Sequence, residues 1–203
     1  MKTAIIGAGN MGGSIARGLA KGTIIPANDI IVSNPTQHKL DVLKAEFPAL
    51  QTTRDNQEAV TGAELIILAV KPWLIKPVVS ELKLKSKQIL ISVAAGIPFE
   101  ELAHYVADKE MTMFRLIPNA AISEMESMTL IASRNASKEQ EQLLLDIFNQ
   151  MGLAMLIPED KITAATALAS CGIAYVLKYI QAAMQAGIEM GPVSYTHLRA
   201  HET

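Results

Sequence analysis

Short apolar runs of strand length alternate with stretches of helical spacing over most of the chain. This alternation is typical of a doubly wound α/β architecture, in which helices cover both faces of a mainly parallel sheet. The pattern predicts strands at Thr3–Ile6, Asp29–Ser33, Gln51–Thr53, Leu65–Ala69, Gln88–Val93 and Met111–Leu116. It predicts helices between them, at Met11–Lys21, His38–Glu46, Asn56–Val60, Trp73–Leu82 and Phe99–Val106.

Two further apolar segments, Met128–Ala132 and Ala154–Ile157, flank a predicted helix at Lys138–Met151. We expect both segments to be strands that extend the sheet at one edge, as often happens in large sheets of this class. The first domain is therefore predicted to span residues 1–157.

The pattern changes after Pro158, where one long helix is predicted from Glu159 to Met190. Proline is favoured at the start of a helix, and the carboxylates of Glu159 and Asp160 suit its positive N-terminal end. The helix is rich in alanine and apolar residues, so we expect it to be buried against other helices, including those of a partner chain. Residues 158–192 are interpreted as part of a second, helical domain.

The last stretch, Val193–Thr203, continues no periodicity and holds two of the four histidines. Our hypothesis is that these residues are a non-native tail at a point of truncation. A genuine short tail is the alternative. We exclude this stretch from the functional argument.

Charge and composition argue against several classes of protein. The chain carries 18 Lys and Arg against 20 Asp and Glu, a formal net charge of −2, so no global field favours nucleic acid. Its longest charge-free apolar stretch, Ile162–Leu177, is shorter than the roughly 20 residues that cross a bilayer, so no membrane span is expected. The single cysteine, Cys171, cannot form an internal disulfide, and the first strand leaves no room for a signal peptide. These features predict a cytoplasmic location.

A glycine-rich run lies directly after the first predicted strand and directly before the first predicted helix. In such a dinucleotide fingerprint, Gly7 permits the tight turn, Gly9 lets the backbone approach a pyrophosphate, and Gly12 lets the helix pack on the strand. Backbone N–H groups of the new helix then hold the phosphates. The run predicts a Rossmann-type domain, with an ordinary glycine-rich turn as the alternative.

The end of the second strand indicates which nucleotide binds. Enzymes that prefer NAD place an Asp or Glu about 20 residues past the glycines, where it binds the ribose 2′-hydroxyl. This chain has no carboxylate there, whereas Ser33, Asn34 and Thr36 offer hydrogen bonds to a 2′-phosphate and Lys39 adds charge. We therefore predict NADP(H), with NAD(H) as the alternative. The same residues also suit capping of the following helix, and the two roles are compatible.

Two more loops follow central strands. Ala69–Pro72 ends one strand at a proline turn, and Ser92–Ile97 ends the next with Gly96 available for close backbone approach. Ligands of open α/β sheets bind at the carboxyl ends of strands, so both loops are expected to face the nicotinamide half of the cofactor. Each string alone is an ordinary strand end.

Taken together and in this order, five strings resemble the pyrroline-5-carboxylate reductase family, over nearly everything up to Pro192. They are GAGNMGGSIA at Gly7–Ala16, AVKP at Ala69–Pro72, SVAAGI at Ser92–Ile97, RLIPNAA at Arg115–Ala121 and TALASCGIAY at Thr166–Tyr175. The resemblance implies an oxidoreductase that reduces 1-pyrroline-5-carboxylate to L-proline with NADPH, the last step of proline biosynthesis. It also implies that the long helix is the first of an all-α dimerisation domain, and that the intact protein forms a homodimer or a higher homo-oligomer.

The resemblance, with the glycine motif, assigns residues to the site. For the cofactor they are Gly7, Ala8, Gly9, Asn10, Met11, Gly12, Ser33, Asn34, Asn56, Ala69, Val70, Lys71, Ala95, Gly96 and Ile97. Pro118, Asn119 and Cys171 are assigned to the substrate, although the apolar context of Cys171 also suits a small core residue. No catalytic residue is assigned. His38 and His104 lack partners at metal-binding spacing, so no metal site is predicted.

The chain departs from the family pattern in two ways. Where the family commonly reads Ser-Gly-Ser-Gly-Pro-Ala, this chain has Ala169-Ser170-Cys171-Gly172-Ile173-Ala174. The family's Gly- and Thr-rich loop for the substrate carboxylate, and its later helices, have no counterpart before residue 203. Two alternatives follow: an NADP-binding fragment without turnover, and a related β-hydroxyacid-type dehydrogenase. The second would need a catalytic lysine, for which Lys178 is the nearby candidate, without support from its surroundings.

Overall fold

The strands form one eight-stranded sheet in the computed structural model, which describes residues 1–190. Their order across the sheet is β3-β2-β1-β4-β5-β6-β7-β8. The strands are β1 (Thr3–Ile6), β2 (Ile30–Ser33), β3 (Gln51–Thr53), β4 (Leu65–Leu68), β5 (Ile89–Ser92), β6 (Met113–Ile117), β7 (Ser127–Arg134) and β8 (Gly152–Leu156). All eight predicted strands are therefore confirmed, with ends shifted by a few residues.

The sheet is parallel from β3 to β6, and only β7 runs antiparallel to its neighbour β6 before pairing in parallel with β8. The chain starts at β1 in the middle, moves outward to β3, and returns to the other side of β1 at β4. This reversal creates a switch point at the carboxyl ends of β1 and β4, where open α/β sheets bind ligands. The predicted mainly parallel, doubly wound sheet is confirmed.

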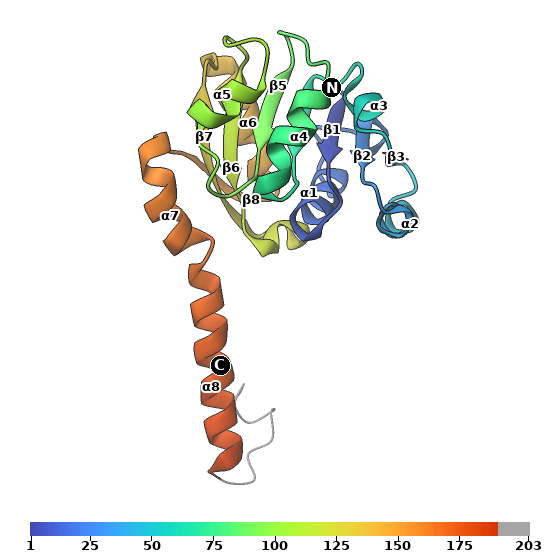
Figure 1. The fold of residues 1–203 in the computed structure, drawn as a ribbon. Coiled ribbons are helices and arrows are strands. Elements are labelled where there is room, and N and C mark those ends of the chain that lie inside the picture. The colour runs from blue at the N-terminus through green and yellow to red at the C-terminus, as the bar shows by residue number, and fades with distance from the viewer. Residues whose placement is uncertain (191–203) are drawn as a thin grey trace.

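Helices cover both faces of the sheet (Figure 1). They are α1 (Asn10–Lys21), α2 (Gln37–Glu46), α3 (Asn56–Val60), α4 (Pro72–Glu81), α5 (Phe99–Tyr105), α6 (Lys138–Asn149), α7 (Ile162–Ala169) and α8 (Gly172–Glu189). Helices α1, α2 and α6 pack against one apolar core, and α3, α4, α5 and the start of α7 pack against the other. Neighbouring residues of β1 divide between them, because Ile5 faces the first core while Ala4 and Ile6 face the second.

The predicted single helix from Glu159 to Met190 is wrong in its continuity. A short 3₁₀ turn at Glu159–Lys161 leads into α7. The helix is then interrupted at Ser170 and Cys171 before α8 begins. The N–H groups of Ser170 and Cys171 both donate to the carbonyl of Thr166, at 3.0 Å each. Ser170 and Gly172 are weak helix formers, and a serine side chain offers the backbone other partners, so the break occurs where propensity is lowest.

Within one chain, most of this helical region is not buried, so its predicted burial against a partner chain stays a prediction. Helix α8 extends away from the sheet (Figure 1), and its large side chains face solvent, with Tyr179 75% exposed. On α7, Leu168 is 81% exposed. Cys171 is exposed as well, so the interpretation of this residue as part of the core does not hold. Residues 1–158 supply a packing surface for α7, through Ile162, Ala165 and Ala169, and leave most of α8 exposed.

By length and composition, the helical stretch Glu159–Glu189 could cross a membrane, and 6% of its most apolar part is buried. The charge-free run alone does not indicate this, because the helical stretch continues past it with two charged residues, Lys178 and Glu189. Such composition is equally expected of a helix that packs against a second subunit. The prediction for Val193–Thr203 lies outside the described residues.

Candidate cofactor and substrate site

Each glycine of the turn between β1 and α1 has a different physical reason to be glycine. Gly7 has φ +105°, and a Cβ there would lie 2.6 Å from the carbonyl oxygen of Ala69. A Cβ on Gly12 would lie 1.9 Å from the carbonyl oxygen of Gly7, so this residue lets the helix approach the turn. A Cβ on Gly9 would meet no atom within 4 Å. Gly9 therefore borders open space, as expected of a residue whose backbone faces a bound pyrophosphate.

The N-terminus of α1 is prepared for an anion. Its N-cap residue, Gly9, has no side chain to accept the first backbone N–H groups, and the first turn contains no acidic residue. These N–H groups carry the positive end of the helix dipole and lack partners within the helix. A phosphate group fits both the charge and the donors.

The predicted adenosine-side residues converge on this turn. Asn34 is 7% exposed, and its Oδ1 accepts a hydrogen bond from the N–H of Ala8 at 3.0 Å, while its Nδ2 donates to the carbonyl of Thr36 at 3.2 Å. The Ser33 hydroxyl donates to Oδ1 of Asn56 at 2.7 Å. The side chain of Asn34 thus holds the glycine turn, and the expectation that it also donates to a 2′-phosphate stays a prediction.

The two predicted nicotinamide loops lie side by side. Strands β4 and β5 pair in parallel with Leu68 opposite Ser92, so the residues that follow them emerge at the same edge. Lys71 and Ala95 are exposed there, and Gly96 has φ +79°. Ile97 turns its side chain into the second core, so only its backbone is available to a ligand.

The predicted substrate residues meet at the break between α7 and α8. Asn119 is 7% exposed, and its Nδ2 donates to the carbonyl of Ala169 at 3.5 Å, while its Oδ1 accepts from the N–H of Ala121 at 3.0 Å. The Ser170 hydroxyl donates to the carbonyl of Pro118 at 3.4 Å. The segment after β6 and the exposed Cys171 are thereby held next to each other, although they are far apart in the sequence.

Comparison with known proteins agrees with this geometry. Residues 2–96 match the family model "NADP oxidoreductase coenzyme F420-dependent", and residues 159–196 match "Pyrroline-5-carboxylate reductase dimerisation". Pyrroline-5-carboxylate reductase 2 of Dictyostelium discoideum is 35% identical over 204 residues, which cover 93% of this chain and 68% of that protein. The chain belongs to the pyrroline-5-carboxylate reductase family.

Solved structures of the reductase family give the same result. A pyrroline-5-carboxylate reductase from Coxiella burnetii superposes with a TM-score of 0.86 at 30% identity, covering 97% of this chain and 74% of that one. The reductase of Plasmodium falciparum, solved with NADP bound, superposes with a TM-score of 0.88 at 26% identity, covering 98% and 74%. The chain therefore spans between two thirds and three quarters of the length of these reductases.

One feature of this family member is not predicted by the sequence pattern. Arg115 on β6 is 7% exposed, and its Nη1 lies 2.7 Å from Oε1 of Glu159. The same oxygen accepts the N–H of Phe99 at 2.7 Å, at the start of α5. The sequence pattern indicates Glu159 only as a charge at a helix N-terminus. A signal is nevertheless present, because Arg115 is a charge inside an apolar strand, and such residues are rarely buried without a partner.

This ion pair joins the sheet of the reductase to the start of its C-terminal helices. The Arg115 guanidinium carbon also lies 6.0 Å from the centre of the Phe99 ring, within the range of a cation–π contact. Within residues 1–190 its Nε is buried without a hydrogen-bond partner. The pair thus fixes the start of α5, directly after the predicted nicotinamide loop that follows β5, relative to the residue that begins the helical region.

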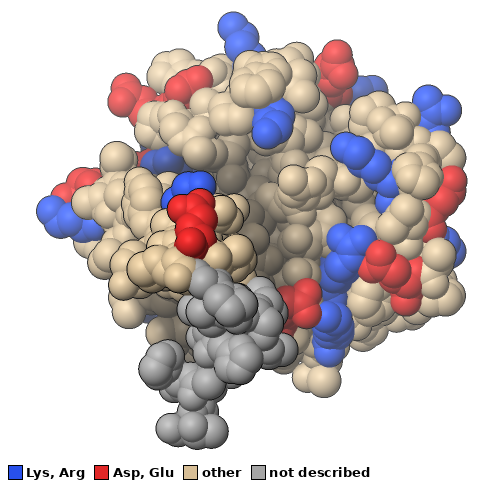
Figure 2. Space-filling model, turned by 90° about the horizontal axis from the view of Figure 1, so that it is seen from below, with Lys and Arg blue, Asp and Glu red and all other residues tan. Residues whose placement is uncertain are grey.

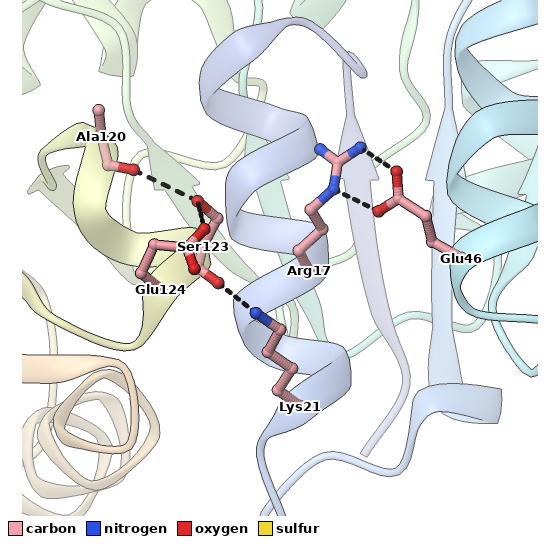
Figure 3. A network of polar contacts seen from close by, with 6 residues as sticks. All are labelled: Arg17, Lys21, Glu46, Ala120, Ser123 and Glu124. Carbon is pink, nitrogen blue, oxygen red and sulfur yellow. Dashed lines mark hydrogen bonds and ion pairs between the residues drawn. The ribbon is translucent and has the colours of Figure 1, made fainter.

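Helix α1 of the reductase is held on both flanks by polar contacts (Figure 3). Arg17 makes two hydrogen bonds to the carboxylate of Glu46 on α2, at 2.6 and 2.8 Å, and these bonds hold the pKa of Glu46 below its usual value. On the other flank, Lys21 donates to the carbonyl of Ser123 at 2.5 Å. Ser123 belongs to the 3₁₀ helix Ala120–Glu124, which follows Asn119. Helix α1 is therefore tied to α2 on one flank and to the segment that follows Asn119 on the other.

Proposed function

We propose that this chain is an NADPH-dependent oxidoreductase that reduces 1-pyrroline-5-carboxylate to L-proline, the last step of proline biosynthesis. The observation that carries the proposal is the convergence of three loops on one edge of the sheet: the glycine turn after β1 and the loops after β4 and β5. Family membership gives this convergence its chemical meaning, because the relatives and the structural neighbours are named as pyrroline-5-carboxylate reductases.

We propose the following roles for the cofactor residues. The backbone from Gly7 to Gly12 holds the pyrophosphate against the N-terminus of α1. The pair formed by Ser33 and Asn56 holds the adenosine end. Asn34 fixes the glycine turn by accepting a hydrogen bond from the N–H of Ala8. The exposed loops after β4 and β5, from Ala69 to Lys71 and from Ala95 to Ile97, hold the nicotinamide end. The open space at Gly9 supports this assignment, since a Cβ there would occupy the place of the ligand rather than clash with protein.

When bound, the cofactor would supply the hydride that reduces the carbon of the substrate C=N bond, and the ring nitrogen would become the amine of proline. The substrate imine is already protonated, so no strong acid from the protein is required. Addition of the hydride then neutralises its positive charge. What this chain contributes is orientation of the two reactants and exclusion of water. We propose that Pro118 and Asn119 shape the substrate side, with the exposed Cys171 beside them.

We also propose that the intact reductase is a homodimer or a higher homo-oligomer in the cytoplasm. The match of residues 159–196 to a dimerisation family supports self-association, and so does the uncovered apolar surface of α8. A second copy of the chain is the simplest occupant of that surface, since closed assemblies of identical chains are the commonest kind. The division into residues 1–157, 158–192 and 193–203 remains a prediction.

A two-step measurement tests the proposed activity. Trp73 is the only tryptophan, is 72% exposed, and directly follows the Lys71–Pro72 turn, so its fluorescence should change when NADPH binds. Oxidation of NADPH is then followed by absorbance with pyrroline-5-carboxylate present. Binding with substrate-dependent oxidation supports the reductase.

Binding without oxidation would support a second candidate, a cofactor-binding chain without turnover. This candidate is favoured by one observation, namely that the chain spans 68% to 74% of the relatives described above. The absence of NADPH binding would contradict both candidates.

A further inference from the structure

We propose that Arg54 binds the 2′-phosphate of the cofactor and sets the preference of this chain for NADPH over NADH. Arg54 lies in the loop between β3 and α3, outside the segment after β2 that the sequence pattern singles out. The inference rests on the proposed function, because it requires the adenosine half of the cofactor at the end of β2.

The topology brings Arg54 to that place. Strands β2 and β3 pair in parallel with Ser33 opposite Thr53, and the N–H of Asn34 continues the ladder to the carbonyl of Thr53 at 3.2 Å. The residues after each strand therefore leave the sheet side by side. Nε of Arg54 donates to the carbonyl of Pro35 at 3.2 Å, which places the guanidinium over the loop where the 2′ position of the ribose is read.

The guanidinium is held but still has donors to offer. Only its Nε is used, and within residues 1–190 neither terminal nitrogen makes a hydrogen bond or an ion pair with a carboxylate. Arg54 is exposed, so a ligand can reach these nitrogens. A planar fork of N–H donors fixed at one end is suited to a phosphate, which accepts two parallel hydrogen bonds from it.

The acidic residues beside Arg54 already have other partners. Asp55 caps α3 by accepting from the N–H groups of Gln57 and Glu58, at 2.7 and 3.2 Å. The carboxylate of Glu58 accepts from the hydroxyl of Thr53. The positive charge of Arg54 therefore remains available to an anion rather than being neutralised by a close ion pair.

The start of α2, on the other side of this loop, lacks negative charge as well. Helix α2 has no acidic residue in its first turn, and the side chain of its N-cap, Thr36, makes no capping hydrogen bond. Figure 2 shows several Lys and Arg side chains on the right of the molecule, the side of β2, β3 and α2 in Figure 1, with acidic side chains among them. A dianionic 2′-phosphate would add both charge and hydrogen-bond acceptors to this environment.

Two competing roles for the residues around this loop predict different results. Lys39 lies in the first turn of α2 and could supply the charge instead, in which case its removal would carry the whole effect. Arg54 could also serve only to tie two loops together through Pro35. Removal of Arg54 would then weaken NADPH and NADH binding alike, because both nucleotides share the adenosine that the loops surround.

The test uses the full 203-residue chain, and isothermal titration calorimetry measures its affinity for NADPH, NADH and adenosine 2′,5′-bisphosphate. For Arg54→Gln we expect NADPH and the bisphosphate to bind about 10- to 100-fold more weakly, as is typical for the loss of charge-assisted hydrogen bonds, while NADH affinity stays unchanged. Arg54→Lys should fall between, because it keeps the charge but loses the fork. The controls are Lys39→Gln on α2 and Arg134→Gln at the far end of β7, of which the second should change nothing.

A second readout is ionic strength. Added salt should reduce the NADPH preference of the unaltered chain and have little effect on that of Arg54→Gln, because the contact is electrostatic and solvent-exposed. Unchanged NADPH affinity in Arg54→Gln, or an equal loss for both nucleotides, would overturn the role of Arg54 and leave the proposed function intact. Failure of the unaltered chain to bind either nucleotide would overturn both.

Discussion

The sheet region of this chain buries its apolar residues, whereas the C-terminal helices leave most of theirs exposed. Residues of the sheet region pack into two continuous cores, one on each face. Helices α7 and α8 are as apolar as many core helices, yet they contribute Ile162 and Gly187 as buried residues and leave the rest of their surface exposed or half-exposed. The first region is complete within one chain, and the second is built to be covered by something else.

The largest expected effect tests this contrast with two leucines. Leu116 on β6 is fully buried, so Leu116→Ala should lower the free energy of unfolding by about 2–5 kcal/mol, the usual cost of a cavity in a core. Leu168 on α7 is 81% exposed, and Leu168→Ala should change the free energy of unfolding by less than about 0.5 kcal/mol. Urea unfolding of dilute protein measures both. A large loss for Leu168→Ala under these conditions would mean that α7 is covered within one chain.

The next effect concerns the two glycines at the start of α1. A Cβ at residue 12 would lie 1.9 Å from the carbonyl oxygen of Gly7, so Gly12→Ala should distort the turn, lower the unfolding free energy by about 1–3 kcal/mol and weaken NADPH binding. A Cβ at residue 9 would meet no atom within 4 Å, so Gly9→Ala should keep the fold stable.

The readouts for this pair are urea unfolding and titration with NADPH. Gly9→Ala should weaken NADPH binding without loss of stability, because its methyl group would enter the space that we assign to the pyrophosphate. Normal NADPH affinity in a folded Gly9→Ala protein would contradict that assignment.

The joint between the two regions should give an intermediate effect. Glu159→Gln removes the negative partner of Arg115 and leaves a buried guanidinium without its counter-charge, which is costly even when the acid itself is partly exposed. We expect a loss of about 1–2 kcal/mol of unfolding free energy, discounted for the 34% exposure of the Glu159 side chain.

A double-mutant cycle sharpens this test. Arg115→Met should also destabilise the protein, but the double variant Arg115→Met with Glu159→Gln should be more stable than the sum of the two single losses predicts, since neither charge is then left alone. Strict additivity in urea unfolding would show that the two residues do not act as a pair.

The smallest effect is the pH dependence of the contact between α1 and α2. Because hydrogen bonds from Arg17 lower the pKa of Glu46, the stabilisation is complete above the ordinary glutamate pKa of 4.5 and is lost as the pH falls through the lowered value in the folded state. At this exposed site we expect about 0.5–1 kcal/mol. Glu46→Gln should remove that part of the acid dependence in thermal unfolding, whereas Glu81→Gln, on the exposed surface of α4, should not.

The sheet region could be predicted well from the sequence because its signals are local. The strand Thr3–Ile6, for example, is a short β-branched apolar run that ends at a glycine turn, and the structure places it at these residues. The candidate loops could be predicted as well, since residues that follow parallel strands must meet at one edge. The 3₁₀ helix Ala120–Glu124 could not be predicted, because its sequence carries no apolar period of its own.

The remainder depends on contacts between distant residues. Arg115 and Glu159 are 44 positions apart, and Arg54 reaches Pro35 across 19 positions. No local pattern encodes such pairs. The break at Ser170 is equally hidden, because an alanine-rich segment satisfies helical periodicity on both sides of it. Its contacts with Pro118 and Asn119 are visible in the structure alone.

The break between α7 and α8 lies against the segment that we propose for the substrate, through the hydrogen bond from Ser170 to Pro118. Helix α8 has 18 residues and is therefore about 27 Å long, at 1.5 Å of rise per residue. A rotation of about 5° at Ser170 would displace its far end by about 2 Å, which is enough to change which side chains meet a neighbouring helix. A contact made by another helix at the distal end of α8 would therefore be coupled, through Ser170, to the carbonyl of Pro118.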